Sequence, residues 1–138
     1  MKPFFPLLLF TMLMISCRTG SGGKEGTFQP DAANVQIVLF HLSQRCESCM
    51  AVENETIRLL EEEYWDAYAT GEVKFIPLDY QSENGKEAST LLRAAGQTLF
   101  VVKGDSISNL TSPAFMYAST HPEYYREALR TALDKFLK

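Results

Sequence analysis

The stretch "VQIVLFHLSQRCESCMAVENETIRLL", residues 35–60, decides the fold of this chain. It opens with an apolar, β-branched run at 35–42 that is typical of a strand buried on both faces. From Glu47 onward the apolar residues recur at helical spacing, and two cysteines, Cys46 and Cys49, stand where the two patterns meet. The stretch therefore predicts a buried strand that leads directly into a helix, with a pair of thiols at the junction. The apolar face of that helix is predicted to comprise Val52, Leu59, Leu60, Tyr64 and Ala67.

The rest of the chain alternates strand and helix patterns. Strands are predicted at 35–42, 73–80, 97–102 and 107–111, and helices at 47–70, 86–95 and 120–138. Because a helix joins the first two strands, these should be parallel, whereas the Gly104-Asp105 turn makes the last two a hairpin. The order β-α-β-α-β-β-α thus predicts an α/β domain with a mixed four-stranded sheet flanked by helices.

Local signals predict where these elements end. Pro77 requires its strand to lie at a sheet edge or to be irregular. Thr120 and Glu123 match a capping box for the last helix, and residues 112–119 are expected to form a loop. The glycines that should end the first two helices are Gly71 and Gly96.

The N-terminal stretch has a different character. Lys2 is followed by an apolar run at 4–15, which is shorter than the roughly 20 residues that span a bilayer and fits the hydrophobic region of a signal peptide. Residues 14–17, Met-Ile-Ser-Cys, resemble a bacterial lipobox, in which cleavage frees a cysteine that is then lipidated. The resemblance implies a lipoprotein signal peptide at 1–16 and a lipid anchor on Cys17. An ordinary signal peptide with an incidental cysteine is the alternative.

Composition and cysteine count fit this organisation. Residues 17–33 are rich in glycine and polar side chains, which predicts a lipidated cysteine with a flexible tether, followed by a folded domain at 34–138. Three cysteines in an exported protein would leave one unpaired, but a lipidated Cys17 leaves Cys46 and Cys49 as a self-contained pair. The hydrophobic content of 46% supports a packed core, and the net charge of -4 argues against nucleic-acid binding.

The position of the two thiols predicts different reactivities. Cys46 should lie at the helix N-terminus, where free N–H groups and the positive end of the helix dipole stabilise an anion. Its pKa should therefore be lowered; the preceding Arg45 adds positive charge, whereas Glu47 opposes both effects. Cys49 follows one helical turn later, within disulfide range, and is placed to resolve a mixed disulfide that Cys46 forms.

The junction around "CESC", the element order and the "LFVVKGDSI" hairpin resemble the thioredoxin superfamily over residues 34–138. This resemblance implies a minimal thioredoxin fold and thiol–disulfide exchange through Cys46 and Cys49. The chain looks most like the short thioredoxin-like lipoproteins of bacterial envelopes, some of which carry the family label of nitrophenyl-compound nitroreductase subunit. Such a protein would be lipid-anchored to a bacterial membrane and face the periplasm. Its partner would be a protein disulfide or dithiol of the envelope, with a membrane electron donor among the candidates.

Two positions depart from the thioredoxin pattern. The family usually carries a cis-proline before the third strand, in a loop that binds the partner's backbone. The aligned residue here is Gln97, and we expect its peptide bond to be trans because a cis bond without proline costs about 2.5–4 kcal/mol. Many thioredoxins also bury an acid on the first strand to assist proton transfer. The aligned residue is Phe40, and the adjacent His41 is either a packed strand residue or a proton shuttle.

Other uses of the cysteine pair are open to different degrees. A c-type haem needs a histidine after the second cysteine, where Met50 stands, and a structural zinc site needs four ligands at a spacing that His41 and His121 do not provide. We therefore expect no cofactor. Two alternatives remain: a soft-metal site for Cu(I), which thiolates suit, and a redox-inactive interaction module with a structural disulfide.

Overall fold

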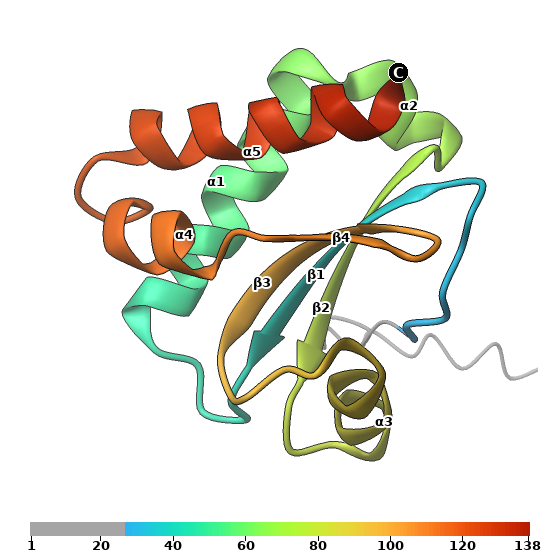
Figure 1. Ribbon diagram of the computed structural model, residues 1–138. Helices are drawn as coiled ribbons and strands as arrows, with labels where there is room; N and C mark the ends of the chain where they lie inside the picture. The colour runs from blue at the N-terminus through green and yellow to red at the C-terminus, as the bar shows by residue number, and fades with distance from the viewer. Residues whose placement is uncertain (1–26) are drawn as a thin grey trace, which may run out of the picture.

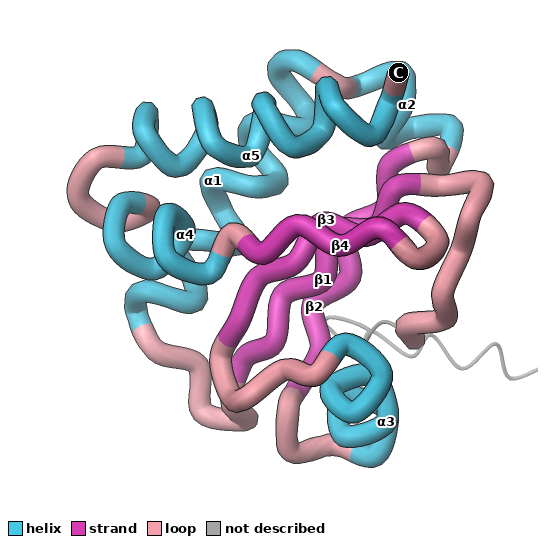
Figure 2. The backbone as a smooth tube through the Cα atoms, viewed as in Figure 1, coloured by secondary structure: helices cyan, strands magenta, loops and turns pink. Residues whose placement is uncertain are grey.

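A computed structural model describes residues 27–138, which contain a four-stranded sheet. The strand order is β2-β1-β3-β4, where β1 is Val35–His41, β2 is Val73–Asp79, β3 is Thr98–Lys103 and β4 is Ser106–Asn109 (Figure 2). β1 runs parallel to β2 and antiparallel to β3, and β3 and β4 form an antiparallel hairpin. The predicted α/β class and mixed sheet are confirmed, and the order of elements is that of a thioredoxin-like fold.

Helices cover both faces of the sheet. The helices are α1 (Glu47–Glu63), α2 (Trp65–Thr70), α3 (Glu83–Leu92), α4 (Thr111–Tyr117) and α5 (Pro122–Leu137). α1, α4 and α5 lie on one side of the sheet and α3 lies on the other (Figure 1). The described chain therefore keeps the predicted β-α-β-α-β-β-α order and adds two short helices, α2 and α4.

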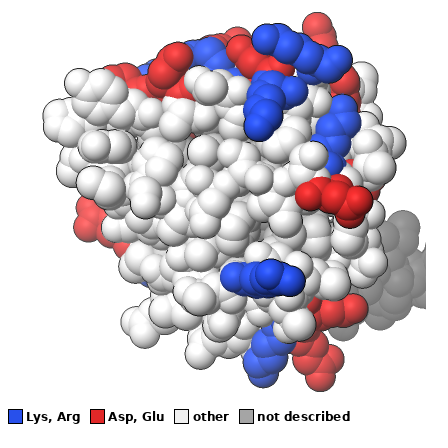
Figure 3. Space-filling model, in the orientation of Figure 1, with Lys and Arg blue, Asp and Glu red and all other residues white. Residues whose placement is uncertain are grey.

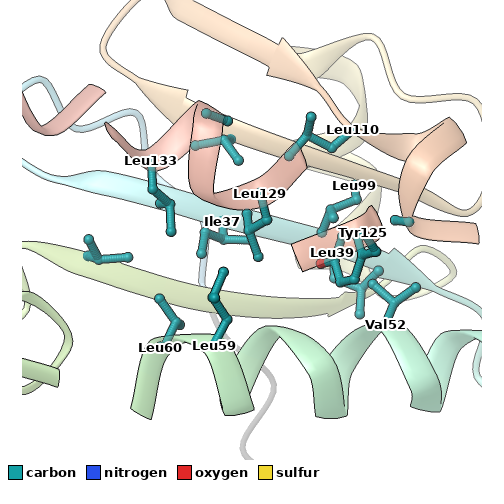
Figure 4. Packing of buried hydrophobic residues seen from close by; sticks show 14 of the residues in the cluster. Ile37, Leu39, Val52, Leu59, Leu60, Leu99, Leu110, Tyr125, Leu129 and Leu133 are labelled. Carbon is teal, nitrogen blue, oxygen red and sulfur yellow. The ribbon is translucent and has the colours of Figure 1, made fainter. Parts of the chain in front are cut away.

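The core has two parts, one on each side of β1, which is buried along its whole length. On one side, Ile37 and Leu39 pack against α1 and α5 (Figure 4). On the other, Val38 and Phe40 pack against α3. Successive side chains of a strand point to opposite faces, so the apolar residues of this buried strand fill both parts, as predicted. From the predicted apolar face of the first helix, Val52, Leu59 and Leu60 are buried, and Tyr64 and Ala67 pack partly buried against them.

Pro77 lies on an edge strand, as predicted. Val35 N–H donates to the Glu72 carbonyl and Tyr80 N–H donates to the His41 carbonyl, each at 2.8 Å. In a parallel pair of strands, only every second residue hydrogen-bonds to a given neighbour. The even-numbered residues of β2 therefore form the hydrogen bonds to β1. The missing N–H of Pro77 consequently faces away from the sheet, where no ladder bond is lost.

The predicted helix at 47–70 is divided in two, which is a correction. It breaks at Tyr64, whose φ of -126° and ψ of 24° are not helical. The Tyr64 hydroxyl donates to Asp134 Oδ1 on α5 at 2.6 Å, so a contact between helices holds the break. Gly71, in the left-handed region with φ 81°, ends α2 as predicted.

The predicted helix at 86–95 begins and ends three residues earlier, as α3. Its start is set by Ser82, whose hydroxyl accepts the Gly85 N–H at 3.0 Å. Its end is set by Arg93, which adopts the left-handed conformation with φ 52°, so Gly96 is not the terminating residue. The prediction placed the end of the helix at Gly96 and did not consider Ser82 as its N-cap.

The predicted loop at 112–119 is also wrong, because most of it forms α4. Ala114 and Ala118, four residues apart and so on one face of this helical segment, are both buried against the core. The predicted capping box of α5 is wrong as well. Thr120 donates its hydroxyl to the Met116 carbonyl at 3.2 Å, and His121, which offers no side-chain cap, precedes Pro122.

The folded part begins earlier than the predicted boundary at 34. Phe28 is 4% exposed and packs in the core part beneath α3. Asp31 accepts the Gly104 N–H through its carbonyl at 2.9 Å and pairs with Lys74 at 3.2 Å. Residues 27–33 are therefore attached to the domain, not part of a tether. The predicted signal peptide at 1–16, Cys17 and the tether up to residue 26 lie outside the described residues. Within 27–138, no helix is both long enough and apolar enough to cross a bilayer.

Charged side chains gather along the upper edge of the face shown in Figure 3, where α5 lies, and much of the rest of that face is uncharged. Ion pairs join α5 to α1: Arg130 Nε and Nη2 lie 2.7 and 2.6 Å from the two carboxylate oxygens of Glu63. This two-point contact lowers the pKa of Glu63. The pairing fixes α5 along α1, and α1 carries the cysteine pair.

A buried hydroxyl pair also joins these two helices, and it yields a prediction. The Tyr125 and Thr56 hydroxyl oxygens lie 2.6 Å apart, and Thr56 also donates to the Val52 carbonyl at 2.6 Å. Tyr125→Phe should lower the free energy of unfolding by about 1 kcal/mol, because one buried hydrogen bond is removed while Thr56 keeps its other partner. Urea denaturation measures the change. Tyr124→Phe, at an exposed position, is the control, and equal effects of the two substitutions would contradict the prediction.

Candidate redox site

The two cysteines lie where β1 is joined to α1, as the sequence predicts. Cys46 is the N-cap of α1 and is exposed, whereas Cys49 lies in the first turn and is 1% exposed. Their Sγ atoms are 3.2 Å apart, which is longer than the roughly 2.05 Å of a disulfide bond. The pair is thus a dithiol in which one sulfur faces solvent and the other is shielded, at a separation that needs little movement to close.

The surroundings of Cys46 favour its thiolate. The Cys49 thiol, which can donate to an ionised Cys46, makes the largest contribution to lowering the pKa of Cys46. Backbone N–H groups of Cys49 and Ser48 at the helix N-terminus and the amide of Gln97 act in the same direction. By distance and angle the Cys46 side chain makes no capping hydrogen bond to α1, so these amides act on the sulfur as nearby dipoles. Cys46 is therefore the more acidic of the two thiols.

The surroundings of Cys49 favour its neutral thiol. Burial, followed by the contact with Cys46 and the negative charge that Cys46 acquires, raises the pKa of Cys49 to about 11. The positive charge of Arg45 offsets a part of this rise. Cys49 is thus a weak nucleophile until Cys46 is bonded to another sulfur and no longer carries that charge.

Gln97 contacts the exposed sulfur. Its side-chain Nε2 donates to Cys46 Sγ at 3.8 Å, and the residue is partly exposed just before β3. No cis peptide bond occurs within residues 27–138, so the expected trans bond at Gln97 is confirmed. The amide therefore lies beside the thiol and offers the thiolate a donor that the proline expected from the resemblance would lack.

Charged residues stand on both sides of Cys46 in the chain. Arg45 forms an ion pair with Glu53 of α1, which holds its guanidinium. The positive charge of Arg45 acts to lower the pKa of Cys49, and its effect on Cys46 stays a prediction. Glu47 lies exposed in the first turn of α1.

His41 lies at the end of β1 and is buried. Its Nδ1 lies 3.0 Å from the Leu42 carbonyl oxygen, which can only accept, so Nδ1–H is the donor in this contact. Phe40 packs beneath α3, on the opposite side of the sheet from α1. Because successive side chains alternate, His41 points to the α1 side of the sheet. Its partner in the register between β1 and β2 is Asp79. The proton-shuttle role of His41 stays a prediction.

Sequence reasoning missed the residues that hold the loop between β1 and Cys46. Ser43 donates its hydroxyl to Asp79 Oδ2 at 2.6 Å, and its N–H donates to Gln81 Oε1 at 3.3 Å. A signal was present, because the carboxyl ends of adjacent parallel strands meet at one edge of a sheet. Asp79 is the last but one residue of the second predicted strand, 73–80, and lies at the same end of the sheet as the cysteine junction, so its carboxylate belonged among the candidates.

Comparisons with known proteins add little to this description. No protein-family model matches the chain, and a search of curated proteins gives no significant match. Similar solved structures include a malarial protein, at 15% identity and a TM-score of 0.49 over 76% of this chain and 99% of that chain. Thioredoxin f2 of Chlamydomonas reinhardtii is similar at 19% identity and a TM-score of 0.42, over 60% of this chain and 68% of that chain. The fold assignment rests on strand order and pairing, and the nitroreductase-subunit family has no support among these matches.

The difference between the two thiols predicts their order of alkylation. With a pKa of about 11, only about one Cys49 thiol in ten thousand is ionised at pH 7, and the side chain is buried. Iodoacetamide should therefore label Cys46 at least tenfold faster at neutral pH, and Cys49 should stay almost unlabelled during exposures short enough to leave most of Cys46 free. Peptide mapping of the reduced protein after short exposures measures both rates. Preferential labelling of Cys49 would contradict the assignment of Cys46 as the reactive thiol.

Proposed function

We propose that this protein carries out thiol–disulfide exchange, with Cys46 as the attacking thiol and Cys49 as the resolving thiol. One observation supports this most strongly: an exposed sulfur with a lowered pKa lies 3.2 Å from a buried sulfur with a raised pKa. A purely structural disulfide does not require its two thiols to differ in pKa or exposure. Across one helical turn it would also stabilise the fold little.

The exchange proceeds in two balanced steps. The Cys46 thiolate attacks a partner disulfide, forming a mixed disulfide and releasing one partner thiolate. Cys49 then loses its proton and attacks Cys46 Sγ, which forms the Cys46–Cys49 disulfide and releases the second partner thiolate. The protein has then given two electrons to the partner, and the two protons released by Cys46 and Cys49 balance the two partner thiolates. The reverse sequence oxidises a partner dithiol.

This function is tested by mixing the reduced protein with oxidised glutathione. We expect one internal disulfide and two released glutathione thiols per chain, detected by mass spectrometry and thiol counting. The Cu(I) alternative is tested with a chromogenic Cu(I) chelator. Within residues 27–138, no three His, Cys, Asp or Glu side chains converge, so the two sulfurs, with Met50 as the next residue in the chain, would be the donors. Retention of Cu(I) against the chelator, with no internal disulfide formed, would favour that alternative over exchange.

We further propose that the protein is a lipoprotein of a bacterial cell envelope, anchored through Cys17 and facing the periplasm. The support is the lipobox-like Met-Ile-Ser-Cys at 14–17 after an apolar run of signal-peptide length. The partner would then be an envelope protein that carries a disulfide or a dithiol. A lipid chain with a short glycine-rich connection to Phe28 would keep the redox pair close to the membrane surface.

Replacement of Cys17 tests the anchor. Cys17→Ala should move the protein from the membrane fraction to the soluble fraction or block its processing, because the acyl acceptor is removed. Fractionation, with mass spectrometry of the N-terminal peptide, measures this. Cys49→Ala, which leaves Cys17 intact, is the matched control. A mature chain that begins elsewhere than Cys17 and carries no lipid would contradict the anchoring proposal.

A further inference from the structure

Three residues connect the loop before Cys46 to the end of β2, and we call them the Asp79 clasp: Ser43, Asp79 and Gln81. Asp79 Oδ2 accepts the Ser43 hydroxyl at 2.6 Å, and Asp79 Oδ1 accepts the Gln81 N–H at 2.9 Å. Gln81 Oε1 in turn accepts the Ser43 N–H at 3.3 Å. The clasp thus binds both the hydroxyl and the backbone of Ser43, which lies three residues before the reactive thiol.

The sheet order places the clasp and Gln97 on opposite sides of the loop. β1 lies between β2 and β3. Ser43 is attached to the end of β2, whereas Cys46 is contacted by Gln97, which directly precedes β3. The loop therefore crosses the end of β1 and is held at one side by Asp79 and at the other by the hydrogen bond between the amide and the sulfur.

We propose that Asp79 is a positioning residue for Cys46: through the Ser43 hydroxyl it fixes the loop that presents this thiol to Gln97. The hydrogen bond from Gln97 Nε2 to Cys46 Sγ is long, at 3.8 Å, so it breaks before the shorter bonds nearby when the loop becomes more mobile. The backbone amides at the start of α1 belong to the same helix as Cys46 and do not depend on the clasp. This inference rests on the proposed role of Cys46 as the attacking thiol.

Asp79 is a charged acceptor under ordinary conditions. The Ser43 hydroxyl, followed by the Gln81 N–H and the positive charges of His41 and Arg45, lowers the pKa of Asp79 against the opposing effect of burial. A charged acceptor makes a stronger hydrogen bond than a neutral one, which agrees with the short 2.6 Å distance. The clasp is therefore present throughout the pH range in which Cys46 ionises.

The test is the pH profile of Cys46 alkylation in the full chain, purified in detergent. In Ser43→Ala the charges of Asp79, Arg45 and Glu53 all remain, so a change reports the missing hydrogen bond and not a missing charge. We expect the midpoint of the profile to move upward by about 0.5 pH unit, with the plateau rate unchanged, since one weak hydrogen bond to the thiolate is removed. Ser43→Thr, which keeps the hydroxyl, should restore the wild-type midpoint.

A double-substitution cycle tests whether the effect passes through Gln97. Gln97→Ala alone should move the midpoint by a similar amount, and Ser43→Ala should then add no further shift. An unchanged midpoint in Ser43→Ala, no rescue by Ser43→Thr, or full additivity with Gln97→Ala would overturn the inference. Wild-type protein in which Cys46 is not the faster thiol would instead contradict the proposed function, so the two failures are distinguishable.

Discussion

Replacing Cys49 with serine is expected to turn the protein into a trap for its partner. Cys46 remains exposed in this variant, and the serine hydroxyl can donate to its thiolate in place of the Cys49 thiol, so Cys46 still attacks a partner disulfide. The resolving step needs the sulfur that lies 3.2 Å away, and serine cannot perform it. Mixed disulfides joined through Cys46 should therefore accumulate at least tenfold above the wild-type level and disappear on reduction. Non-reducing gels followed by peptide mapping measure them.

Cys46→Ser is the matched control for this experiment. The remaining thiol, Cys49, is buried, and burial is the largest cause of its raised pKa. It should therefore trap little partner, and turnover of a model protein disulfide should be abolished. Both variants should stay folded, because a bridge over one helical turn contributes little stability. Equal trapping by the two variants would contradict the division of roles, and unfolding of both would favour a structural clip.

Gly85→Ala is expected to have the largest effect on stability among simple substitutions near the site. A Cβ atom at this buried position would lie 1.8 Å from the Asp79 carbonyl oxygen and 2.7 Å from the Asp79 carbonyl carbon. Alanine ordinarily stabilises a helix by about 1 kcal/mol relative to glycine. Here the collision is with backbone, which cannot rotate away, so α3 must move from the end of β2. We expect a net loss of about 3 kcal/mol in the free energy of unfolding.

Urea denaturation of Gly85→Ala and Asn84→Ala side by side tests this expectation. Asn84 is the exposed neighbour in the same turn of α3, so its substitution should change the free energy of unfolding by less than about 0.5 kcal/mol. A Gly85→Ala variant that matches Asn84→Ala in stability would show that α3 can shift without cost and would contradict the prediction.

The sheet could be predicted from the sequence because its signals are local. The backbone is constrained within a few residues by the apolar run of β1, by the Gly104-Asp105 turn and by Pro77. The buried strand, the hairpin and the edge strand that these signals predict are all observed. Two of the wrongly predicted features depend on contacts that periodicity does not contain. The break at Tyr64 is held by Asp134, which is far away in the sequence, and α4 is held by burial of Ala114 and Ala118.

The candidate site divides in the same way. The Cys-x-x-Cys spacing at the helix start predicts the exposed and the buried sulfur, because both follow from the geometry of one helical turn. The ion pair between Arg45 and Glu53 joins residues eight positions apart, so the sequence order alone does not reveal it. The bond from Ser43 to Asp79 joins residues separated by 36 positions, so only the parallel pairing of β1 and β2 reveals it.

An equilibrium redox titration of the chain in glutathione buffers tests the central claim most directly. Thiol–disulfide exchange predicts a single reversible two-electron transition, in which peptide mapping finds both Cys46 and Cys49 free at the reducing end and joined to each other at the oxidising end. A pair that stays oxidised at every glutathione ratio would be a structural clip. A pair that stays reduced, or that yields a glutathione adduct in place of the internal disulfide, would equally contradict thiol–disulfide exchange by this protein.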